Sequence, residues 1–157
     1  MWHAGLVAQS PLTGVLVVVG VLALATAFGW WRRRRDGRLR VVAGTGPAAA
    51  DETSAVLAAV GVRPGGVTLV QFSSAVCAPC RATRRILDDV TRDVDGVRLL
   101  EVDAEHHLDA VRALDVWRTP TVLVVDADGR VVRRASGVPV RAELVATIRP
   151  LLAGAAR

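Results

Sequence analysis

The sequence contains no lysine, only two cysteines and only three histidines among its 157 residues. The scarcity of cysteine and histidine argues against a zinc site. A structural zinc ion takes four ligands, so two of them would have to come from His3, His106 and His107. His106 and His107 are adjacent, so on a helix or strand they point in divergent directions and rarely bind one ion together. We therefore expect no metal.

Outside one short segment the chain has no excess of basic charge. All 20 basic residues are arginines, and six of them fall between Arg32 and Arg40, while the whole chain carries a net charge of +5. From Asp51 onward, 14 acidic residues are balanced by 14 arginines. A nucleic-acid partner, whose phosphates select a basic surface, is therefore not expected. The length allows one ordinary domain plus an appendage.

Charged residues are also absent from residues 12–31, a run of 20 positions that ends in Trp30 and Trp31. At about 1.5 Å per residue a helix of this length spans roughly 30 Å, the thickness of the hydrocarbon core of a bilayer. Four arginines at 32–35 follow it as a stop, whereas residues 1–11 contain no arginine or lysine. A cleaved signal peptide has the opposite order of charge, so we predict an uncleaved transmembrane helix at 12–31.

The same charge asymmetry predicts the orientation. Basic residues remain on the cytoplasmic side of a membrane, so residues 1–11 are expected to be a short extracytoplasmic N-terminus. Residues 32–50 are expected to form a basic, flexible linker, and residues 51–157 a soluble domain that faces the cytoplasm. The predicted location is the cell membrane, with a single pass. In a reducing cytosol the cysteines would be held mostly as a dithiol.

Both cysteines belong to one motif, Cys77-Ala78-Pro79-Cys80, which follows a β-rich run and opens a predicted helix. This placement suits a redox pair, because the partial positive charge of a helix N-terminus, about half an elementary charge, stabilises a thiolate on the first cysteine. Cys77 is therefore the candidate nucleophile and Cys80 the candidate resolving thiol. Half a zinc site, an inert pair and a structural disulfide compete with this interpretation, and a disulfide closing so short a loop would gain little stability.

The predicted elements of the soluble part alternate between helix and strand, which implies a sheet covered on both faces. A closing hairpin is predicted at Asp126-Ala127-Asp128-Gly129. The strands are expected at 39–42, 67–72, 97–102, 121–125 and 131–135, and the helices at 51–60, 81–90, 108–114 and 141–152. The strand at 121–125 is an apolar run after Thr121, which indicates burial on both faces.

Three motifs in this order resemble the thioredoxin family: residues 72–80 with the cysteine pair, Thr119-Pro120-Thr121, and Gly137 before the last helix. The resemblance covers about 51–153 and implies an α/β, thioredoxin-like fold with a central mixed sheet flanked by helices. It also implies that Pro120 is cis, lies beside the cysteines, and leaves the backbone at Thr119 free to pair with an extended substrate. A trans proline that starts an edge strand is the alternative.

Further residues near these motifs are assigned by the same resemblance. Ala78, Pro79 and Trp117 are expected to contact the substrate, and a packed loop tryptophan is an equal alternative for Trp117. The family's tryptophan before the first cysteine is replaced here by Val76, and its glycine between the cysteines by Ala78.

The most consequential departure concerns a buried acid of the family, which helps to take the proton from the second cysteine and is replaced here by Gln71. An amide cannot act as that base, so we expect slower resolution by Cys80, or another group serving as base. Arg81 is expected either to favour the thiolate or to be a solvated surface residue. Asp103 is interpreted as a strand-end cap.

Together, the predicted transmembrane helix and the resemblance predict a membrane-tethered thiol–disulfide oxidoreductase that reduces protein disulfides through Cys77 and Cys80 without metal or organic cofactor. Its partners would be protein disulfides and a thiol reductant such as thioredoxin reductase. Two alternatives remain open: an extracytoplasmic oxidoreductase for exported proteins or haem-protein maturation, and a thioredoxin-like binding module without activity.

Overall fold

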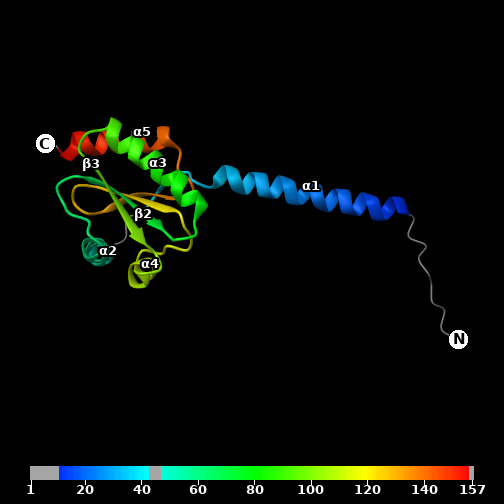
Figure 1. Cartoon of the computed structure of the whole chain (residues 1–157), viewed down its shortest axis with the longest axis horizontal. Coiled ribbons are helices and arrows are strands. Elements are labelled where there is room, and N and C mark those ends of the chain that lie inside the picture. The colour runs from blue at the N-terminus through cyan, green and yellow to red at the C-terminus, as the bar shows by residue number, and fades with distance from the viewer. Residues whose placement is uncertain (1–10, 43–46, 156–157) are drawn as a thin grey trace. The chain divides into compact units, whose positions relative to one another are not determined.

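The computed structural model of the chain describes residues 11–42 and 47–155, which belong to two compact units that divide between Arg35 and Asp36 (Figure 1). Apart from Pro11, the expected extracytoplasmic segment 1–11 lies outside the described residues, and so does His3. Each unit is described by itself below.

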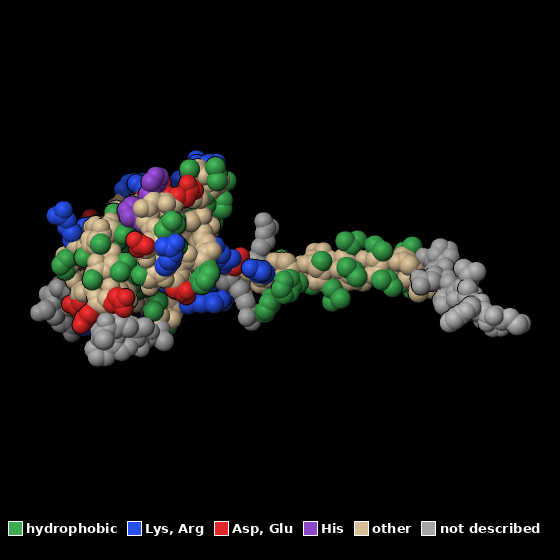
Figure 2. Space-filling model, turned by 90° about the horizontal axis from the view of Figure 1, so that it is seen from below, with side chains coloured by type: hydrophobic (Ala, Val, Ile, Leu, Met, Phe, Trp, Pro, Cys, Tyr) green, Lys and Arg blue, Asp and Glu red, His purple; other side chains and the backbone are tan. Residues whose placement is uncertain are grey.

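The described part of the first unit is the helix α1 (Pro11–Arg35). Its stretch from Leu12 to Arg32 has a mean hydropathy of 2.3 in its most apolar window, and none of that window is buried within the structure. Apolar side chains therefore project from it along its length (Figure 2). By length and composition α1 is able to cross a membrane, and a signal sequence would have the same properties.

The second unit is built on a five-stranded sheet with the order β1-β5-β4-β2-β3. Among the described strands β2 and β3 pair in parallel, and the remaining neighbours are antiparallel. The predicted central mixed sheet is therefore confirmed. Its strands are β1 (Arg40–Val41), β2 (Val67–Ser73), β3 (Val97–Asp103), β4 (Thr121–Val125) and β5 (Val131–Ser136).

Helices cover both faces of this sheet (Figure 1). On one face α2 (Pro47–Ala59) and α4 (Leu108–Ala113) pack over Phe72 and Leu123, and α3 (Ala78–Asp93) and α5 (Arg141–Ala155) cover the other face. The core on the second side contains Leu87 and Ile148, both fully buried. The two cores explain why β2 and β4 are buried at every position, as the apolar run at 121–125 predicted.

Several elements begin or end at residues that differ from the predictions. α3 begins at Ala78 rather than at 81, because Pro79 fits the first turn of a helix, where its missing N–H would have no partner. α2 begins at Pro47 for the same reason, and α5 continues through Pro150 to Ala155. The expected linker at 32–50 thus includes β1 and the first turn of α2, while its residues 43–46 lie outside the described residues.

Candidate functional site

The cysteine pair lies where the buried strand β2 leads into α3. Cys77 is the N-cap of α3, with an extended backbone at φ −87° and ψ 94°, and Ala78 and Pro79 form the exposed start of the helix. The backbone N–H of Cys80 donates to Sγ of Cys77 at 3.1 Å. The two sulfur atoms form a disulfide with their Cα atoms 5.2 Å apart, so the structure describes the oxidised state of the pair.

The two cysteines are almost buried, although the residue before them is exposed. Cys77 retains 9% of its surface and Cys80 retains 4%, whereas the preceding Val76 is 91% exposed. Cys77 is therefore the more accessible of the two cysteines, as a nucleophile that meets a large partner has to be.

The peptide between Thr119 and Pro120 is cis, as the resemblance implied. A hydroxyl pair connects this turn to the cysteine loop: Oγ of Ser74 and Oγ1 of Thr119 are 3.3 Å apart, and the backbone N–H of Cys77 donates to the carbonyl oxygen of Ser74 at 3.2 Å. Pro120 is buried, and its carbonyl oxygen accepts from the N–H of Gly137 at 2.8 Å. The structure thus brings the three predicted motifs together. Sequence reasoning missed Ser74, which has no motif of its own.

Trp117 lies in the loop before this turn and is 88% exposed. Its indole N–H donates to the carboxylate of Asp115. The alternative of a packed loop tryptophan is therefore wrong, and the contact with substrate stays a prediction.

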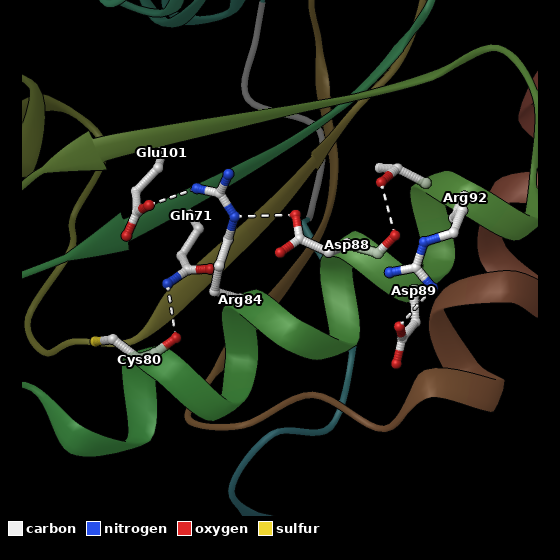
Figure 3. A network of polar contacts seen from close by, with 8 residues as sticks. Gln71, Cys80, Arg84, Asp88, Asp89, Arg92 and Glu101 are labelled. Carbon is white, nitrogen blue, oxygen red and sulfur yellow. Dashed lines mark hydrogen bonds and ion pairs between the residues drawn. The ribbon is translucent and has the colours of Figure 1, made fainter.

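Gln71 is fully buried in β2, directly behind the second cysteine (Figure 3). Its Nε2 donates to the backbone carbonyl oxygen of Cys80 at 3.1 Å, which ties the first turn of α3 to the sheet. Its Oε1 is buried and finds no hydrogen-bond partner among the described residues. Position 71 thus contacts the backbone of Cys80 and has an unused acceptor, but its amide cannot take a proton from the thiol.

A cavity of about 670 Å³ opens beside the cysteines, between the start of α3 and the ends of β2 and β3. Its lining includes both cysteines, the exposed Arg81, and the charged residues Arg84, Glu101 and Asp103. Sequence reasoning missed Glu101, which lies opposite Gln71 in the parallel register of β2 and β3. An alignment of the predicted strands 67–72 and 97–102 would have placed these two residues side by side.

Arg84 is held between two carboxylates (Figure 3). Its Nε donates to Asp88 at 3.0 Å and its Nη1 to Glu101. The hydrogen bond with Asp88 and the charges of Asp88 and Glu101 raise the pKa of Arg84 above its usual value. Arg84 is therefore a permanent cation in the lining of the cavity, and Glu101 is already engaged by it.

Asp103 ends β3 and is occupied locally. Its carboxylate accepts from the N–H of Glu105 at 2.8 Å and from the ring of His106 at 2.9 Å, and these bonds lower the pKa of Asp103. This geometry agrees with a strand-end cap. His107 also turns toward Asp103, with its Nδ1 at 3.0 Å from the carbonyl oxygen. Across the parts of the chain that the structure describes, no three histidine, cysteine or acidic side chains gather as a metal site requires.

A second, larger cavity of about 830 Å³ lies at the β1 and β5 side of the sheet, away from the cysteines. Arginines and valines line it, including Arg40 and Arg134. Its lining contains none of the predicted site residues, so the chemistry of the cysteine pair assigns the functional site to the smaller cavity.

A cysteine pair that caps a helix after a buried strand, beside a cis-proline turn, defines a thiol–disulfide exchange site on an α/β scaffold. Comparison with known proteins agrees. The family model described as Thioredoxin matches residues 57–150. A thioredoxin of Staphylococcus saprophyticus is 30% identical over 84 residues, which cover 53% of this chain and 80% of that protein. A thioredoxin of Staphylococcus haemolyticus is 32% identical over 73 residues, 46% of this chain and 69% of that protein.

This chain belongs to the thioredoxin family, and its second unit has the thioredoxin fold. Solved structures support the fold: thioredoxin of Fasciola hepatica superposes with a TM-score of 0.51 at 22% identity, over 65% of this chain and 93% of that one. Thioredoxin-2 of a malaria parasite gives 0.50 at 20% identity, over 54% and 82%. Membership of the family and the intact cysteine pair support thiol–disulfide oxidoreductase activity.

Proposed function

We propose that the protein is a membrane-tethered reductase of protein disulfides that works through Cys77 and Cys80. The observation that carries this proposal is the cap geometry of Cys77. Its sulfur accepts a backbone N–H at the start of a helix of 16 residues, next to the exposed Val76. A negative charge is stabilised at such a position, so the same contact that orders the disulfide would stabilise the attacking thiolate after reduction.

In the proposed reaction the thiolate of Cys77 attacks one sulfur of a substrate disulfide. A mixed disulfide forms, and the other substrate sulfur leaves as a thiolate. The thiol of Cys80 loses its proton and attacks Sγ of Cys77, which releases the second substrate thiolate and leaves the Cys77–Cys80 disulfide. The substrate gains two electrons and the protein loses two. An external dithiol, such as that of a thioredoxin reductase or another thiol carrier, would return them.

The proposed roles of the surrounding residues follow from their positions. Thr119, whose hydroxyl lies within hydrogen-bond distance of the Ser74 hydroxyl, would pair with the backbone of an extended substrate. Trp117 and Val76 are exposed on the unit that carries the cysteine pair and would supply apolar contact to the substrate. Arg81, on the cavity, would add positive charge beside the thiolate.

Trapping the intermediate tests the reaction. In the Cys80→Ser variant the second step is blocked, so the protein should accumulate mixed disulfides through Cys77 that disappear when dithiothreitol is added. Non-reducing electrophoresis measures them. The matched Cys77→Ser variant should trap at least tenfold less, because Cys80 is the less accessible cysteine. Equal trapping by both variants would remove the distinction between nucleophile and resolving thiol, and stronger trapping by Cys77→Ser would reverse the assigned roles. No trapping by either variant would favour a binding module.

The tether and its orientation form the second part of the proposal. The exposed apolar surface of α1 and the arginines that follow it support a span with the thioredoxin domain in the cytoplasm. Labelling of intact and lysed cells with a membrane-impermeant maleimide tests this. Labelling of the cysteines only after lysis, without added reductant, is the expected result. Labelling of intact cells would instead indicate an oxidoreductase for exported proteins.

A further inference from the structure

The chain directly after α1 is attached to the loops that surround the disulfide site. Asp36 follows the last residue of α1, and its Oδ1 accepts from Nη2 of Arg118 at 2.6 Å. The same nitrogen donates to the carbonyl oxygen of Ser136 at 3.0 Å. Arg118 directly precedes the cis turn at Thr119, so a single side chain joins the start of the domain to the predicted substrate-binding turn.

Backbone contacts hold the next residue more firmly than this half-exposed ion pair could. The N–H of Gly37 donates to the carbonyl oxygen of Ser136 at 2.8 Å, and Gly37 is buried. A Cβ at this residue would lie only 1.9 Å from the carbonyl oxygen of Val138, closer than any ordinary contact. On the opposite side, a Cβ at Gly137 would lie 3.3 Å from the nitrogen of Gly37. The two segments of chain therefore pass each other at a distance that only glycines allow.

The attachment continues away from the site. The N–H of Leu39 donates to the carboxylate of Glu143 at 3.1 Å, and β1 then pairs with β5, with Arg40 opposite Arg134. Residues 36–41 are thus fixed to the domain along their length. No linker residue separates Arg35, where α1 ends, from Asp36, where the folded domain begins.

This attachment limits the reach of the site. A flexible linker of about 30 residues would let the domain move roughly 30 Å from the end of its anchor. No such linker lies between α1 and the domain here, because the domain begins at Asp36, directly after Arg35. The chain is attached at the Ser136–Gly137 loop, and the N–H of Gly137 also donates to the carbonyl oxygen of Pro120 at 2.8 Å. The predicted substrate turn is therefore bonded, through Arg118 and Gly137, to the residues that directly follow α1 in the chain.

From this we infer that the substrates are disulfides close to the bilayer surface, in the membrane-proximal segments of other membrane-anchored proteins. The inference rests on the proposed function, since it needs α1 to cross the membrane and Cys77 to exchange disulfides. Given both, a soluble protein can still collide with the site, but an anchored partner is favoured when its cysteine lies at the same height above the membrane.

Mixed-disulfide capture at two heights tests the inference. The full chain with the Cys80→Ser substitution is reconstituted in vesicles with two anchored reporter peptides, each with one cysteine, in a glutathione redox buffer. One reporter carries its cysteine next to its membrane helix, and the other carries it above a 20-residue helical spacer, about 30 Å long. We expect at least tenfold more mixed disulfide with the short reporter.

A variant with a 30-residue Gly/Ser insert between Arg35 and Asp36 should lose this preference, because its domain can rise to the tall reporter. A control variant with the same insert after Arg157 should keep the preference. Equal capture of the two reporters by the chain without an insert would overturn the inference alone. Failure of Cys77 to form a mixed disulfide with either reporter, or with glutathione, would overturn the proposed function and the inference together.

Discussion

At the scale of single residues, we expect position 71 to influence how the second cysteine loses its proton. Gln71 supports the backbone of Cys80 through a hydrogen bond of 3.1 Å, yet its buried Oε1 is without a partner in the described part of the chain. Glu101, which faces Gln71 in the sheet register, is paired with Arg84. Gln71 therefore holds the backbone of Cys80 but cannot act as a base, and Glu101 is already paired with Arg84. We therefore expect the attack of Cys80 on the mixed disulfide to be slow.

Substitution of Gln71 by Asp should accelerate that step. Burial raises the pKa of a carboxyl group, which brings it closer to neutral pH and makes it a suitable base for a thiol. We expect the release of a substrate thiol from the mixed disulfide at pH 7 to become roughly tenfold faster or more, since general bases contribute about 10²–10⁴-fold. Rapid-quench alkylation measures this release.

The Gln71→Asn variant is the matched control, because asparagine has the size of aspartate but cannot take a proton. An Asp variant that is no faster than the Asn variant would show that proton transfer does not limit the step. The sign of the stability effect follows from the same pKa. The folded-state pKa of the introduced acid lies above its unfolded value of about 3.9, so the free energy of unfolding should fall as the pH rises between the two values.

At the scale of elements, the path of the chain into the short strand β1 depends on Gly37. β1 contributes only Arg40 and Val41, and the approach to it runs through the tight passage at Gly37. Gly37 has a φ of +77°, and a side chain there would collide with the backbone at Val138. The backbone carbonyl cannot rotate away as a flexible side chain could, so the passage requires glycine.

Gly37→Ala should therefore destabilise the domain by more than the roughly 1–2 kcal/mol that a positive φ alone costs. Gly65→Ala is a close control, since Gly65 has a φ of +89° and no atom within 4 Å of an added Cβ. Urea unfolding followed by far-ultraviolet circular dichroism measures both variants. Equal losses would mean that the contact with Val138 has no energetic weight.

The elements themselves can be predicted from the sequence to a large extent. β2, β4 and α3 have strong patterns: β2 is rich in residues that favour strands, β4 is apolar after its first residue, and α3 has buried residues three or four apart. The sequence patterns place the starts of α2 and α3 three or four residues late, although Pro47 and Pro79 are recognisable first-turn signals. Both differences arise because the charged residues at 51 and 81 stand out more clearly than the prolines before them.

The contacts between elements cannot be predicted in the same way. Asp36 and Arg118 are 82 residues apart, and no local pattern indicates that they meet. The positive charge of Arg84 near Gln71 likewise depends on how α3 lies over β2 and β3 (Figure 3). At the site, a family resemblance predicts the cysteines, the cis-proline turn and Gln71, whereas Ser74, Arg84 and Glu101 required the fold.

At the scale of the whole molecule, the division between Arg35 and Asp36 makes a sharp prediction about truncation. A chain of residues 36–157 keeps both cores, the Asp36–Arg118 pair and β1. It should remain soluble without detergent and unfold with the same urea midpoint as the domain of the full chain, and it should retain disulfide exchange with a small disulfide. The urea titration and a disulfide-reduction assay measure these properties.

A chain of residues 42–157 should be less stable, because it loses β1 and Leu39, which packs partly buried against the core under α3 and α5. Burial of an aliphatic side chain is worth about 1.5–3 kcal/mol, so a loss of roughly 2 kcal/mol is expected. Urea titration of the two truncated chains side by side measures it. Identical midpoints would mean that residues 36–41 only lie on the domain.

The exposure of Trp117 has a consequence for how the molecule can be observed. Of the four tryptophans only Trp117 lies after residue 35, and the chain contains no tyrosine, so one indole provides the ultraviolet emission of the 36–157 chain. Because this residue is 88% exposed in the folded state, its spectrum is already that of a tryptophan in water. Unfolding should leave the emission maximum almost unchanged, while a partner that covers the cis-proline loop should shift it to shorter wavelength. The fluorescence of this domain would thus respond to docking and hardly to denaturation.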